Sequence, residues 1–381
     1  MADSNLLVNP RTGPLPAEAR PGPEVLAFHR GLPGYAPTPL HDVPALAAAC
    51  KVGHILVKDE SARLGLPSFK ILGASWATFR TVCARLGLDP ADPATDLATV
   101  AAAAQGAGLA LATATDGNHG RAVARMARLL GLPATILVPE GTAAARVTGI
   151  ESEGAEVRVG GITYDEAVAA SAALADDRTL VVSDTSWPGY EDPPRWVADG
   201  YSTIFAEIEE QIAAAGLPPV DAAVVPIGVG ALASAAAVSL RAGVEPGDGP
   251  LLVGVEPDSA ACMAAAVAAG RVVEVPGPHR SIMAGLNCGL ASQLALPVVT
   301  AGFAAFVAVG DDRCRDAIRA MAAAGMDVGE TGAAALAGLT AVLDDHRAEV
   351  PLPDDATVLL LATEGVTDPV AFGDIVGRSP R

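Results

Sequence analysis

Aromatic residues are scarce in this sequence, since 3 Trp, 4 Tyr and 7 Phe make up only 4% of 381 residues. Half of the chain is nevertheless apolar, so its cores must be packed mainly from Ala, Val, Leu and Ile. Basic residues are also few, with 25 Lys and Arg against 44 Asp and Glu, which gives a net charge of -19. This balance excludes nucleic acid as a partner, because neutralising phosphates requires clustered Lys and Arg.

Cysteine is rare as well, and its spacing excludes a disulfide scaffold. The five cysteines are odd in number and form no CxxC pair: Cys50, Cys83, Cys262, Cys288 and Cys314. This usage predicts a reducing compartment and no structural metal. Residues 1–20 lack the pattern of a secretory signal, and no charge-free apolar run has the length of a membrane span. We therefore expect a cytoplasmic protein without membrane contact.

The chain is long enough for two domains, and strands and helices alternate along most of it. The pattern predicts one set of strands at 109–114, 134–138, 156–159 and 180–183, and another at 55–58, 222–226, 251–256, 306–309 and 358–362. Intervening helices imply parallel pairing, hence an α/β fold with two open α/β domains. We predict a small domain, residues 86–187, inserted in a large one, residues 1–85 and 188–381, with the site in the cleft between them. Residues 1–40, rich in Pro and Gly, are expected to form an extended arm, and residues 89–96 a crossing between domains.

One lysine stands out because it lies in apolar company at a predicted helix start. Lys70 follows Ser68, which is expected to cap the helix, and Phe69, and the run 71–79 has helical apolar spacing. A desolvated lysine loses its proton more readily and becomes an amine nucleophile or Schiff-base former. The alternative is a lysine whose stem packs while its ammonium reaches water.

A second motif, Thr113-Ala-Thr-Asp-Gly-Asn-His-Gly120, follows a predicted strand and opens a helix. Its backbone N–H groups would face a ligand at the carboxyl edge of the sheet. On the alternative interpretation, Asp116 and Asn118 are ordinary turn and cap residues. Asp184 ends another strand and, taken alone, is better explained as an aspartate facing water than as a functional carboxylate.

A third motif, Gly228-Val-Gly-Ala-Leu-Ala-Ser234, lies between a buried strand and a helix, an arrangement that binds a phosphate through backbone donors. The spacing of Gly228, Gly230 and Ala233 also satisfies the dinucleotide pattern GxGxxA, and Glu256 ends the next strand where a ribose-binding acid would lie. A nucleotide-binding module without elimination activity is therefore an alternative, although it gives Lys70 no role.

Taken together, the motifs resemble those of the diaminopropionate ammonia-lyases, pyridoxal-phosphate enzymes of the tryptophan synthase β-subunit fold (fold type II). The segments that carry the resemblance follow in order over most of the chain: 58–61, 65–74, 113–120, 184–190, 282–289 and 362–369. The resemblance implies pyridoxal 5'-phosphate as the cofactor, held covalently by Lys70 with Phe69 against its ring. It further implies Asn118 on the phenolic oxygen, the loop Gly228, Val229, Gly230 and Ala231 on the phosphate, and Thr363 at the pyridine nitrogen.

The activity implied by the resemblance is the α,β-elimination of 2,3-diaminopropionate to pyruvate and ammonia by a homodimer. Asp116 is unusual beside serine and threonine dehydratases, and together with Asp184 it would remove the Cα proton, hold the second amino group or supply a proton to it. Ala362 and Val366 depart from the family pattern and leave substrate recognition open. The alternatives are a dehydratase or lyase of serine, threonine or cysteine, and a sensor that binds the cofactor without turnover.

Overall fold

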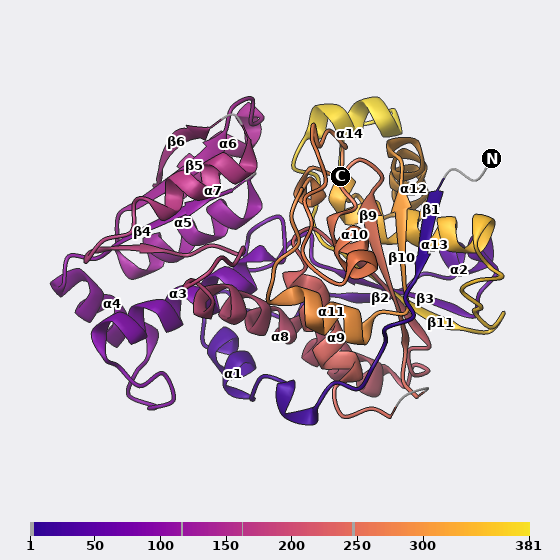
Figure 1. The fold of residues 1–381 in the computed structure, drawn as a ribbon, viewed down its shortest axis with the longest axis horizontal. Coiled ribbons are helices and arrows are strands. Elements are labelled where there is room, and N and C mark those ends of the chain that lie inside the picture. The colour runs from indigo at the N-terminus through magenta and orange to yellow at the C-terminus, as the bar shows by residue number, and fades with distance from the viewer. Residues whose placement is uncertain (1–3, 116, 162, 246–247) are drawn as a thin grey trace. The chain divides into compact units, whose positions relative to one another are not determined.

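The structure is a computed structural model that describes residues 4–115, 117–161, 163–245 and 248–381. The chain divides into two compact units (Figure 1). Unit 1 comprises Met1–Pro21, Ala36–Ser68 and Ser202–Arg381, and unit 2 comprises Gly22–Tyr35 and Phe69–Tyr201. Each unit is an α/β structure built on its own mainly or wholly parallel sheet, which confirms the predicted fold class.

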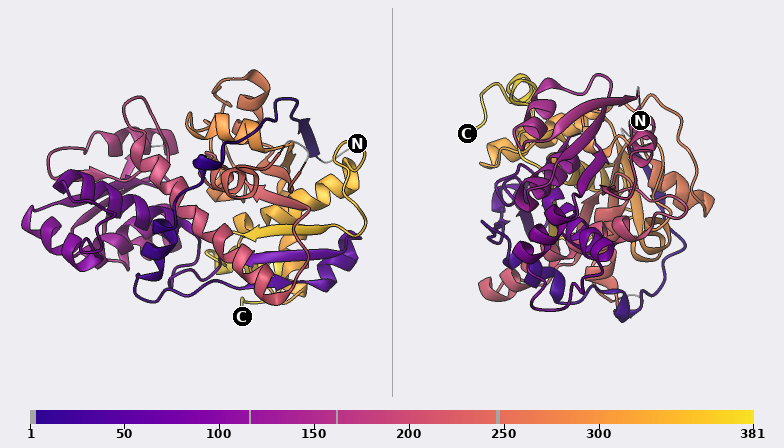
Figure 2. Two further views of the ribbon diagram at one scale, coloured as in Figure 1. Left: turned by 90° about the horizontal axis from the view of Figure 1, so that it is seen from below. Right: turned by 90° about the vertical axis from the view of Figure 1, so that its left-hand side faces the viewer.

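Unit 1 is built on a seven-stranded sheet with the order β1-β10-β9-β8-β11-β3-β2. Its strands are β1 (Ser4–Val8), β2 (Leu40–Asp42), β3 (His54–Asp59), β8 (Ala222–Pro226), β9 (Leu251–Pro257), β10 (Ala305–Val309) and β11 (Thr357–Ala362). The five inner strands are parallel, and only the edge strands β1 and β2 pair antiparallel. Figure 2 shows β11, in yellow, beside β3, in purple, although about 300 residues separate them.

Helices cover both faces of this sheet, so its inner strands are mostly apolar. The helices of unit 1 are α2 (Pro44–Cys50), α9 (Ala231–Arg241), α10 (Cys262–Ala269), α11 (Ala295–Gly302), α12 (Asp311–Ala323), α13 (Glu330–Asp345), α14 (Pro369–Val376) and the second half of α8 (Asp192–Ala215), with short 3-10 turns η1 (Ala17–Ala19) and η2 (Ala284–Leu286). Val358 and Leu360 of β11 join one core with α2, α12 and α13. The alternate residues Leu359 and Leu361 are equally buried and point to the opposite face, as the two-residue period of a strand requires.

Unit 2 contains a four-stranded parallel sheet with the order β6-β5-β4-β7. Its strands are β4 (Ala110–Ala114), β5 (Ala134–Pro139), β6 (Glu156–Gly161) and β7 (Thr179–Val181), and its helices are α1 (Glu24–Arg30), α3 (Lys70–Leu86), α4 (Leu97–Gly106), α5 (Asn118–Leu130), α6 (Ala144–Glu151), α7 (Tyr164–Ala172) and the first half of α8. Helix α7 packs on β4 and β5 through Ala167, Ala114 and Leu137. Since β4 and β7 are parallel neighbours, the turns that follow them lie at the same edge of the sheet.

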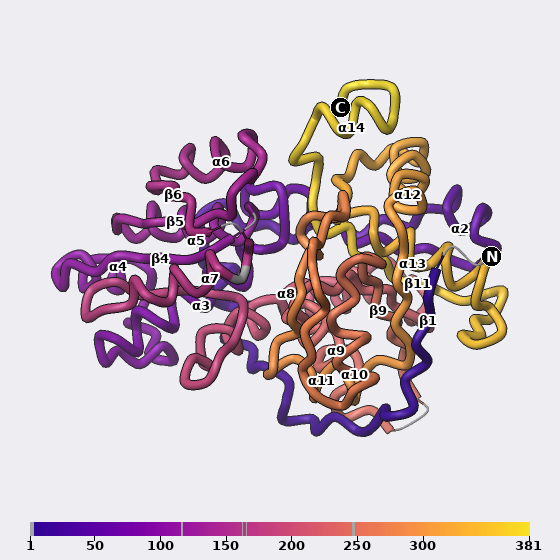
Figure 3. Tube along the Cα trace, turned by 45° about the horizontal axis from the view of Figure 1, so that its top comes forward, coloured from indigo at the N-terminus to yellow at the C-terminus, as the bar shows by residue number. Residues whose placement is uncertain are grey.

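The N-terminal segment corrects the prediction of an extended arm over residues 1–40 in two places. Residues 4–8 form strand β1, which extends the sheet of unit 1, and residues 24–30 form helix α1 of unit 2. Between them the chain is irregular and is anchored to unit 1, because the amide of Asn9 donates to the carbonyls of Thr300 and Phe303. Figure 3 follows this segment as the indigo tube. The N-terminal segment is therefore part of unit 1 at strand β1 and part of unit 2 at helix α1.

The units also divide at residues other than the predicted domain boundaries. Helix α3 and the first turns of α8 group with unit 2, whereas the sequence prediction assigned residues 69–85 and 188–201 to the large domain. The two helices approach closely at glycines, since a Cβ on Gly73 would lie 2.5 Å from the Tyr201 ring and one on Gly200 would lie 2.5 Å from the carbonyl oxygen of Leu72. Residues 89–96, predicted as a crossing between domains, connect α3 to α4 inside unit 2.

The described residues contain neither a membrane-spanning helix nor a cluster of metal ligands. None of their helices combines the length and the apolarity that crossing a bilayer requires. None of their His, Cys, Asp and Glu side chains gather in groups of three or more that could hold a metal ion.

Candidate active site

Lys70 is the first residue of α3, and its ammonium forms an ion pair inside unit 2. The Nζ atom donates to Oδ2 of Asp184 at 2.8 Å, and the two side chains are 21% and 7% exposed. Lys70 Nζ also lies 5.6 Å from the centroid of the Phe69 ring. The predicted cap is corrected: Phe69 occupies the N-cap position without a side-chain hydrogen bond, whereas Ser68 pairs with Glu364 as an isolated β-bridge. Helix α3 thus begins where its lysine faces a buried carboxylate.

The Asp184 carboxylate is held on both oxygens. Tyr164, the first residue of α7, donates its hydroxyl to Oδ1 at 3.2 Å while Lys70 occupies Oδ2. Burial alone would raise the pKa of Asp184. The charge of Lys70, that of His119 when protonated, and the hydrogen bonds from Lys70 and Tyr164 more than offset burial and hold this pKa well below its ordinary range. Asp184 is therefore an anion across the physiological pH range, and the interpretation of it as a water-facing aspartate is wrong because the side chain is buried.

The turn after β4 lies at the same sheet edge as Asp184. Thr115 Oγ1 accepts hydrogen bonds from the backbone N–H groups of Gly117 and Gly120, at 2.9 and 3.0 Å. Asn118 begins helix α5, and the His119 ring contacts the carbonyl oxygen of Val182 at 2.8 Å through Nε2. His119 thereby ties α5 to the end of β7, two residues before Asp184. Asp116, the third predicted catalytic residue, lies outside the described residues.

The glycine loop after β8, which the sequence predicts as a phosphate cradle, lies in unit 1. Gly230 has φ +110°, a conformation that side-chain-bearing residues rarely adopt, and a Cβ there would lie 2.4 Å from Met263 Cε. A Cβ on Gly228 would lie 3.1 Å from the carbonyl oxygen of Gly285. The loop leads into α9, and the Ser234 hydroxyl on the first turns of this helix is buried without a hydrogen-bond partner among the described residues. The N–H groups of the first helical turn, which have no acceptor within the helix, the positive helix end and the orphaned Ser234 hydroxyl fit an anionic group.

Glu256 removes the support for the dinucleotide interpretation of this loop. Its carboxylate accepts hydrogen bonds from the backbone N–H groups of Met263 and Ala264, at 2.7 and 2.9 Å, and thus caps α10. The side chain is fully buried, and burial raises its pKa to about 8 despite the two backbone donors. A ribose-binding acid must face the ligand with free oxygens, which Glu256 does not do.

Thr363 lies at the carboxyl end of β11, directly beside β8 in the sheet of unit 1. Its hydroxyl donates to the carbonyl oxygen of Thr331 at 3.2 Å, a long bond that the hydroxyl can exchange for a better acceptor by rotation. Thr331 in turn accepts a hydrogen bond from the backbone N–H of Gly285. Thr363 is therefore connected to the same 282–289 loop that approaches Gly228.

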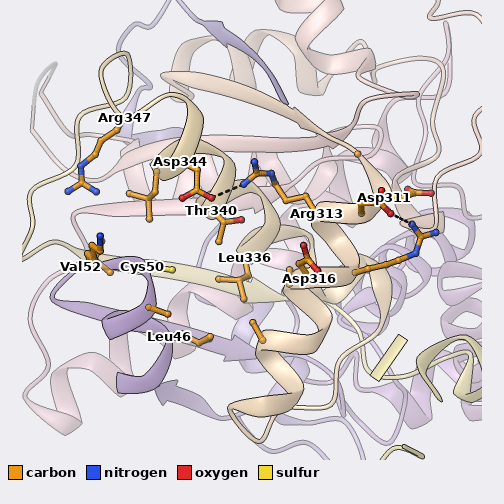
Figure 4. A pocket seen from close by; sticks show the side chains of 18 of the residues that line it. Leu46, Cys50, Val52, Asp311, Arg313, Asp316, Leu336, Thr340, Asp344 and Arg347 are labelled. Carbon is orange, nitrogen blue, oxygen red and sulfur yellow. Dashed lines mark hydrogen bonds and ion pairs between the residues drawn. The ribbon is translucent and has the colours of Figure 1, made fainter. Parts of the chain in front are cut away.

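A groove of about 1470 Å³ elsewhere in unit 1 is lined by none of the predicted site residues. It lies between α2, α12 and α13 and carries several charged side chains (Figure 4). Most of these charges neutralise one another, as in the pair Arg313–Asp344 at 3.0 Å and the pair Arg315–Asp312 at 2.6 Å. The groove thus offers no group comparable to the Lys70–Asp184 pair.

The sequence predicts Lys70, Asp184 and the Gly228 loop as site residues, but not Tyr164, which donates a hydrogen bond to Asp184. No motif marks this residue. The available signal was the capping box formed by Thr163 and Glu166, which begins α7 and places the intervening tyrosine on its first turn.

The sequence and the structure were compared with known proteins. Residues 32–364 match the family described as pyridoxal-phosphate dependent enzyme. The diaminopropionate ammonia-lyase of Salmonella typhimurium strain LT2 is 35% identical over 375 residues, which cover 94% of this chain and 93% of the relative. Two crystal structures of the Escherichia coli diaminopropionate ammonia-lyase superpose with a TM-score of 0.86. One is a complex with D-serine, at 30% identity over 98% and 96% of the two chains, and the other a complex with an aminoacrylate-PLP azomethine reaction intermediate, at 31% identity over 99% and 97%.

Proposed function

Since this chain belongs to the pyridoxal-phosphate dependent enzymes and, among them, to the diaminopropionate ammonia-lyase family, we propose that it converts 2,3-diaminopropionate and water to pyruvate and two molecules of ammonia. The similarity extends over nearly the full length of both chains. The observation that carries the proposal is the pairing of Lys70 with the buried, anionic carboxylate of Asp184. A substrate with two amino groups needs an amine of the enzyme for its reaction and an anionic group that binds its second amino group.

Pyridoxal 5'-phosphate is the cofactor, and the residues present fit it. The Gly228–Ala231 loop provides backbone donors and the positive end of α9 for the phosphate, and Lys70 provides the amine that holds the aldehyde carbon. Thr363 offers a neutral hydroxyl for the ring nitrogen, and Phe69 and Asn118 complete the proposed contacts. When bound, the cofactor supplies an electron sink that makes the Cα proton of an amino acid acidic.

Lys70 is proposed to remove the Cα proton from one enantiomer of the substrate. Asp116 is proposed to remove it from the other. A primary amine that alternates between neutral and protonated forms is suited to removing this proton and returning it. The neutral partner at Thr363 favours prompt elimination over a long-lived carbanion.

Asp184 is proposed to hold the β-amino group of the substrate as an ammonium. When the Cβ–N bond breaks, the electron pair leaves with nitrogen, and an ammonium departs as neutral ammonia without receiving another proton. A carboxylate whose pKa is held below its ordinary range cannot donate a proton near neutrality, but it can stabilise this cation. Of the three roles that the sequence left open for Asp184, binding the ammonium is therefore the best supported.

The direct test is to measure pyruvate release from each enantiomer of diaminopropionate and from serine and threonine, with the visible spectrum recorded throughout. We expect diaminopropionate to be the best substrate and the cofactor band to change when it is added. Faster turnover of serine or threonine would favour the dehydratase alternative, and a spectral change without pyruvate would favour the sensor.

We also propose that the enzyme is a homodimer in the cytoplasm, as the family resemblance and the scattered cysteines suggest. Light scattering coupled to size exclusion would test the dimer, with a mass near twice the 38.1 kDa of one chain as the expected result.

Replacing Gly230 by alanine should weaken cofactor binding at least tenfold. The new Cβ would lie 2.4 Å from Met263 Cε and 2.7 Å from Ala295 Cβ, so the loop must move as well as adopt a strained φ. The dissociation constant of the cofactor can be measured by titrating the apoenzyme. Gly216→Ala is the matched control, since Gly216 also has a positive φ of +62° but no atom within 4 Å of its Cβ position. Equal losses in both variants would show that backbone strain alone, and not the cradle, is responsible.

A further inference from the structure

The carboxylate of Asp184 has two unlike partners in unit 2. Lys70 is a cation that a reaction can displace, since its amine is the group that carries the cofactor in the proposed function. Tyr164 is neutral and contacts the opposite oxygen, Oδ1, at 3.2 Å. One oxygen is therefore bound by a neutral hydroxyl, while the other faces an exchangeable ammonium.

The position of Tyr164 is determined by its neighbours in the chain and not by the carboxylate alone. The hydroxyl of Thr163 accepts from the backbone N–H of Glu166 at 3.2 Å, and the Glu166 carboxylate accepts from the backbone N–H of Thr163 at 3.0 Å. This reciprocal cap fixes the first turn of α7, on which Tyr164 is the leading residue. The phenol is thus presented to Asp184 by a helix end that forms independently of any ligand.

We propose that Tyr164 is a positioning residue that holds Oδ1 of Asp184 so that Oδ2 receives the β-ammonium of the substrate, and that it thereby favours diaminopropionate over serine. The inference rests on the proposed function and adds a specificity-determining residue to it. In this structure a primary ammonium, that of Lys70, occupies Oδ2. The β-ammonium of diaminopropionate has the same charge and the same three donors, so it can take this place when Lys70 Nζ leaves it. The hydroxyl of serine carries no charge and gains far less from the same oxygen.

Tyr164 has a second effect, because a hydrogen bond to the charged form of an acid favours that form. The other titratable groups that act on Asp184 are Lys70 on α3, His119 on α5, Tyr190 on the loop after β7 and Tyr201 on α8. Burial raises the pKa values of both Tyr190 and Tyr201, so they stay neutral, and Tyr190 is engaged with Ser183 and Val181. When Lys70 has moved away, Tyr164 is the one neutral side chain among the described residues whose hydrogen bond to the carboxylate is seen in the structure. Its loss should therefore raise the pKa of Asp184.

The test compares wild type with Tyr164→Phe, a variant that loses only the hydroxyl. We expect kcat/KM for diaminopropionate to fall about 10- to 100-fold, the range for a hydrogen bond to a charged group, mainly through KM. The inhibition constant of D-serine, measured in competition with diaminopropionate, should change less than about threefold. The acidic limb of the kcat/KM profile should move to higher pH, because the Asp184 anion would be lost earlier as the pH falls.

Tyr190→Phe provides the contrasting variant. The Tyr190 hydroxyl accepts from the backbone N–H of Ser183 and donates to the carbonyl of Val181, so its removal loosens the segment that carries Asp184 without removing a donor to the carboxylate. This variant should lower the unfolding temperature and weaken the binding of diaminopropionate and of D-serine to the same extent. Equal effects on diaminopropionate and serine in Tyr164→Phe, or an unmoved acidic limb, would overturn the role of Tyr164 while leaving the function intact. A wild-type enzyme that releases no pyruvate from either enantiomer of diaminopropionate would overturn both.

Discussion

Replacing Lys70 by alanine is expected to abolish the visible cofactor band and to lower kcat for diaminopropionate by about 10³-fold or more, the upper range for losing a group that transfers a proton. The amine is the only side chain beside Asp184 that could bind an aldehyde covalently, because the chain contains just three lysines. Lys51 is exposed at the end of α2, and Lys58 is fully buried in an ion-pair network of unit 1. Absorption spectra and pyruvate release measure the two effects directly.

Two further variants separate chemistry from structure. Lys70→Arg keeps a cation for Asp184 but offers no amine that forms a Schiff base, so it should fold as wild type and yet be colourless and inactive. Lys51→Arg removes an exposed amine that is not among the predicted site residues and should keep full activity. Borohydride reduction of the wild-type holoenzyme, followed by peptide mass analysis, should locate the cofactor on Lys70. Cofactor recovered on Lys51 or Lys58, or a coloured Lys70→Arg variant, would contradict the assignment.

The inner strands could be predicted because strands of a parallel sheet buried on both faces are continuous apolar runs. Ala222–Pro226 and Thr357–Ala362 are examples, and both lie within one residue of their predicted ranges. The edge strands β1 and β2 could not be predicted in this way. They are five and three residues long, and β1 pairs with residues about 300 positions away, as in Ser4 with Val309. Such pairing leaves no local signal in the sequence.

The parts of the site in which a sequence motif determines the backbone conformation could be predicted. The parts in which burial determines the contacts of a charged side chain could not. The spacing of Gly228 and Gly230 indicated a loop that leads into a helix, but taken alone it favoured a dinucleotide over pyridoxal phosphate. Only the structure shows that both carboxylate oxygens of Glu256 accept hydrogen bonds from the first turn of α10. In the same way, the sequence allowed Asp184 to be a solvated strand-end residue, whereas the fold buries it between Lys70 and Tyr164. Partners that come from different helices cannot be inferred from spacing.

The second large effect concerns the stability of unit 1. Glu207 on α8 is fully buried and accepts hydrogen bonds from Lys58 Nζ at 2.7 Å and from two nitrogens of Arg63 at 2.6 and 2.8 Å. Arg63 also pairs with the buried Glu60, and Thr38 donates its backbone N–H to Glu207. Two cations and two anions thus neutralise one another without solvent, in the segment that leads toward Lys70.

Glu207→Gln should lower the free energy of unfolding by about 3 to 5 kcal/mol, because removing one charge leaves Lys58 and Arg63 incompletely compensated in a buried environment. Urea denaturation monitored by far-ultraviolet circular dichroism measures this loss, because the three tryptophans all lie in unit 2 and would not report on unit 1. Glu209→Gln is the matched control, since Glu209 lies on the same helix but is exposed, and its effect should stay within about 0.5 kcal/mol.

The pH dependence gives an independent check on the same network. Burial would raise the pKa of Glu207, but Arg63 and Lys58 more than offset burial and lower it. A carboxylate with a lowered pKa contributes stability above its unfolded-state pKa and loses that contribution as the pH falls through its folded-state value. Wild type should therefore lose more stability than Glu207→Gln on acidification from neutral pH, and the two unfolding free energies should converge. Parallel pH profiles, or equal losses in Glu207→Gln and Glu209→Gln at neutral pH, would show that the buried ion pairs do not determine the stability of unit 1.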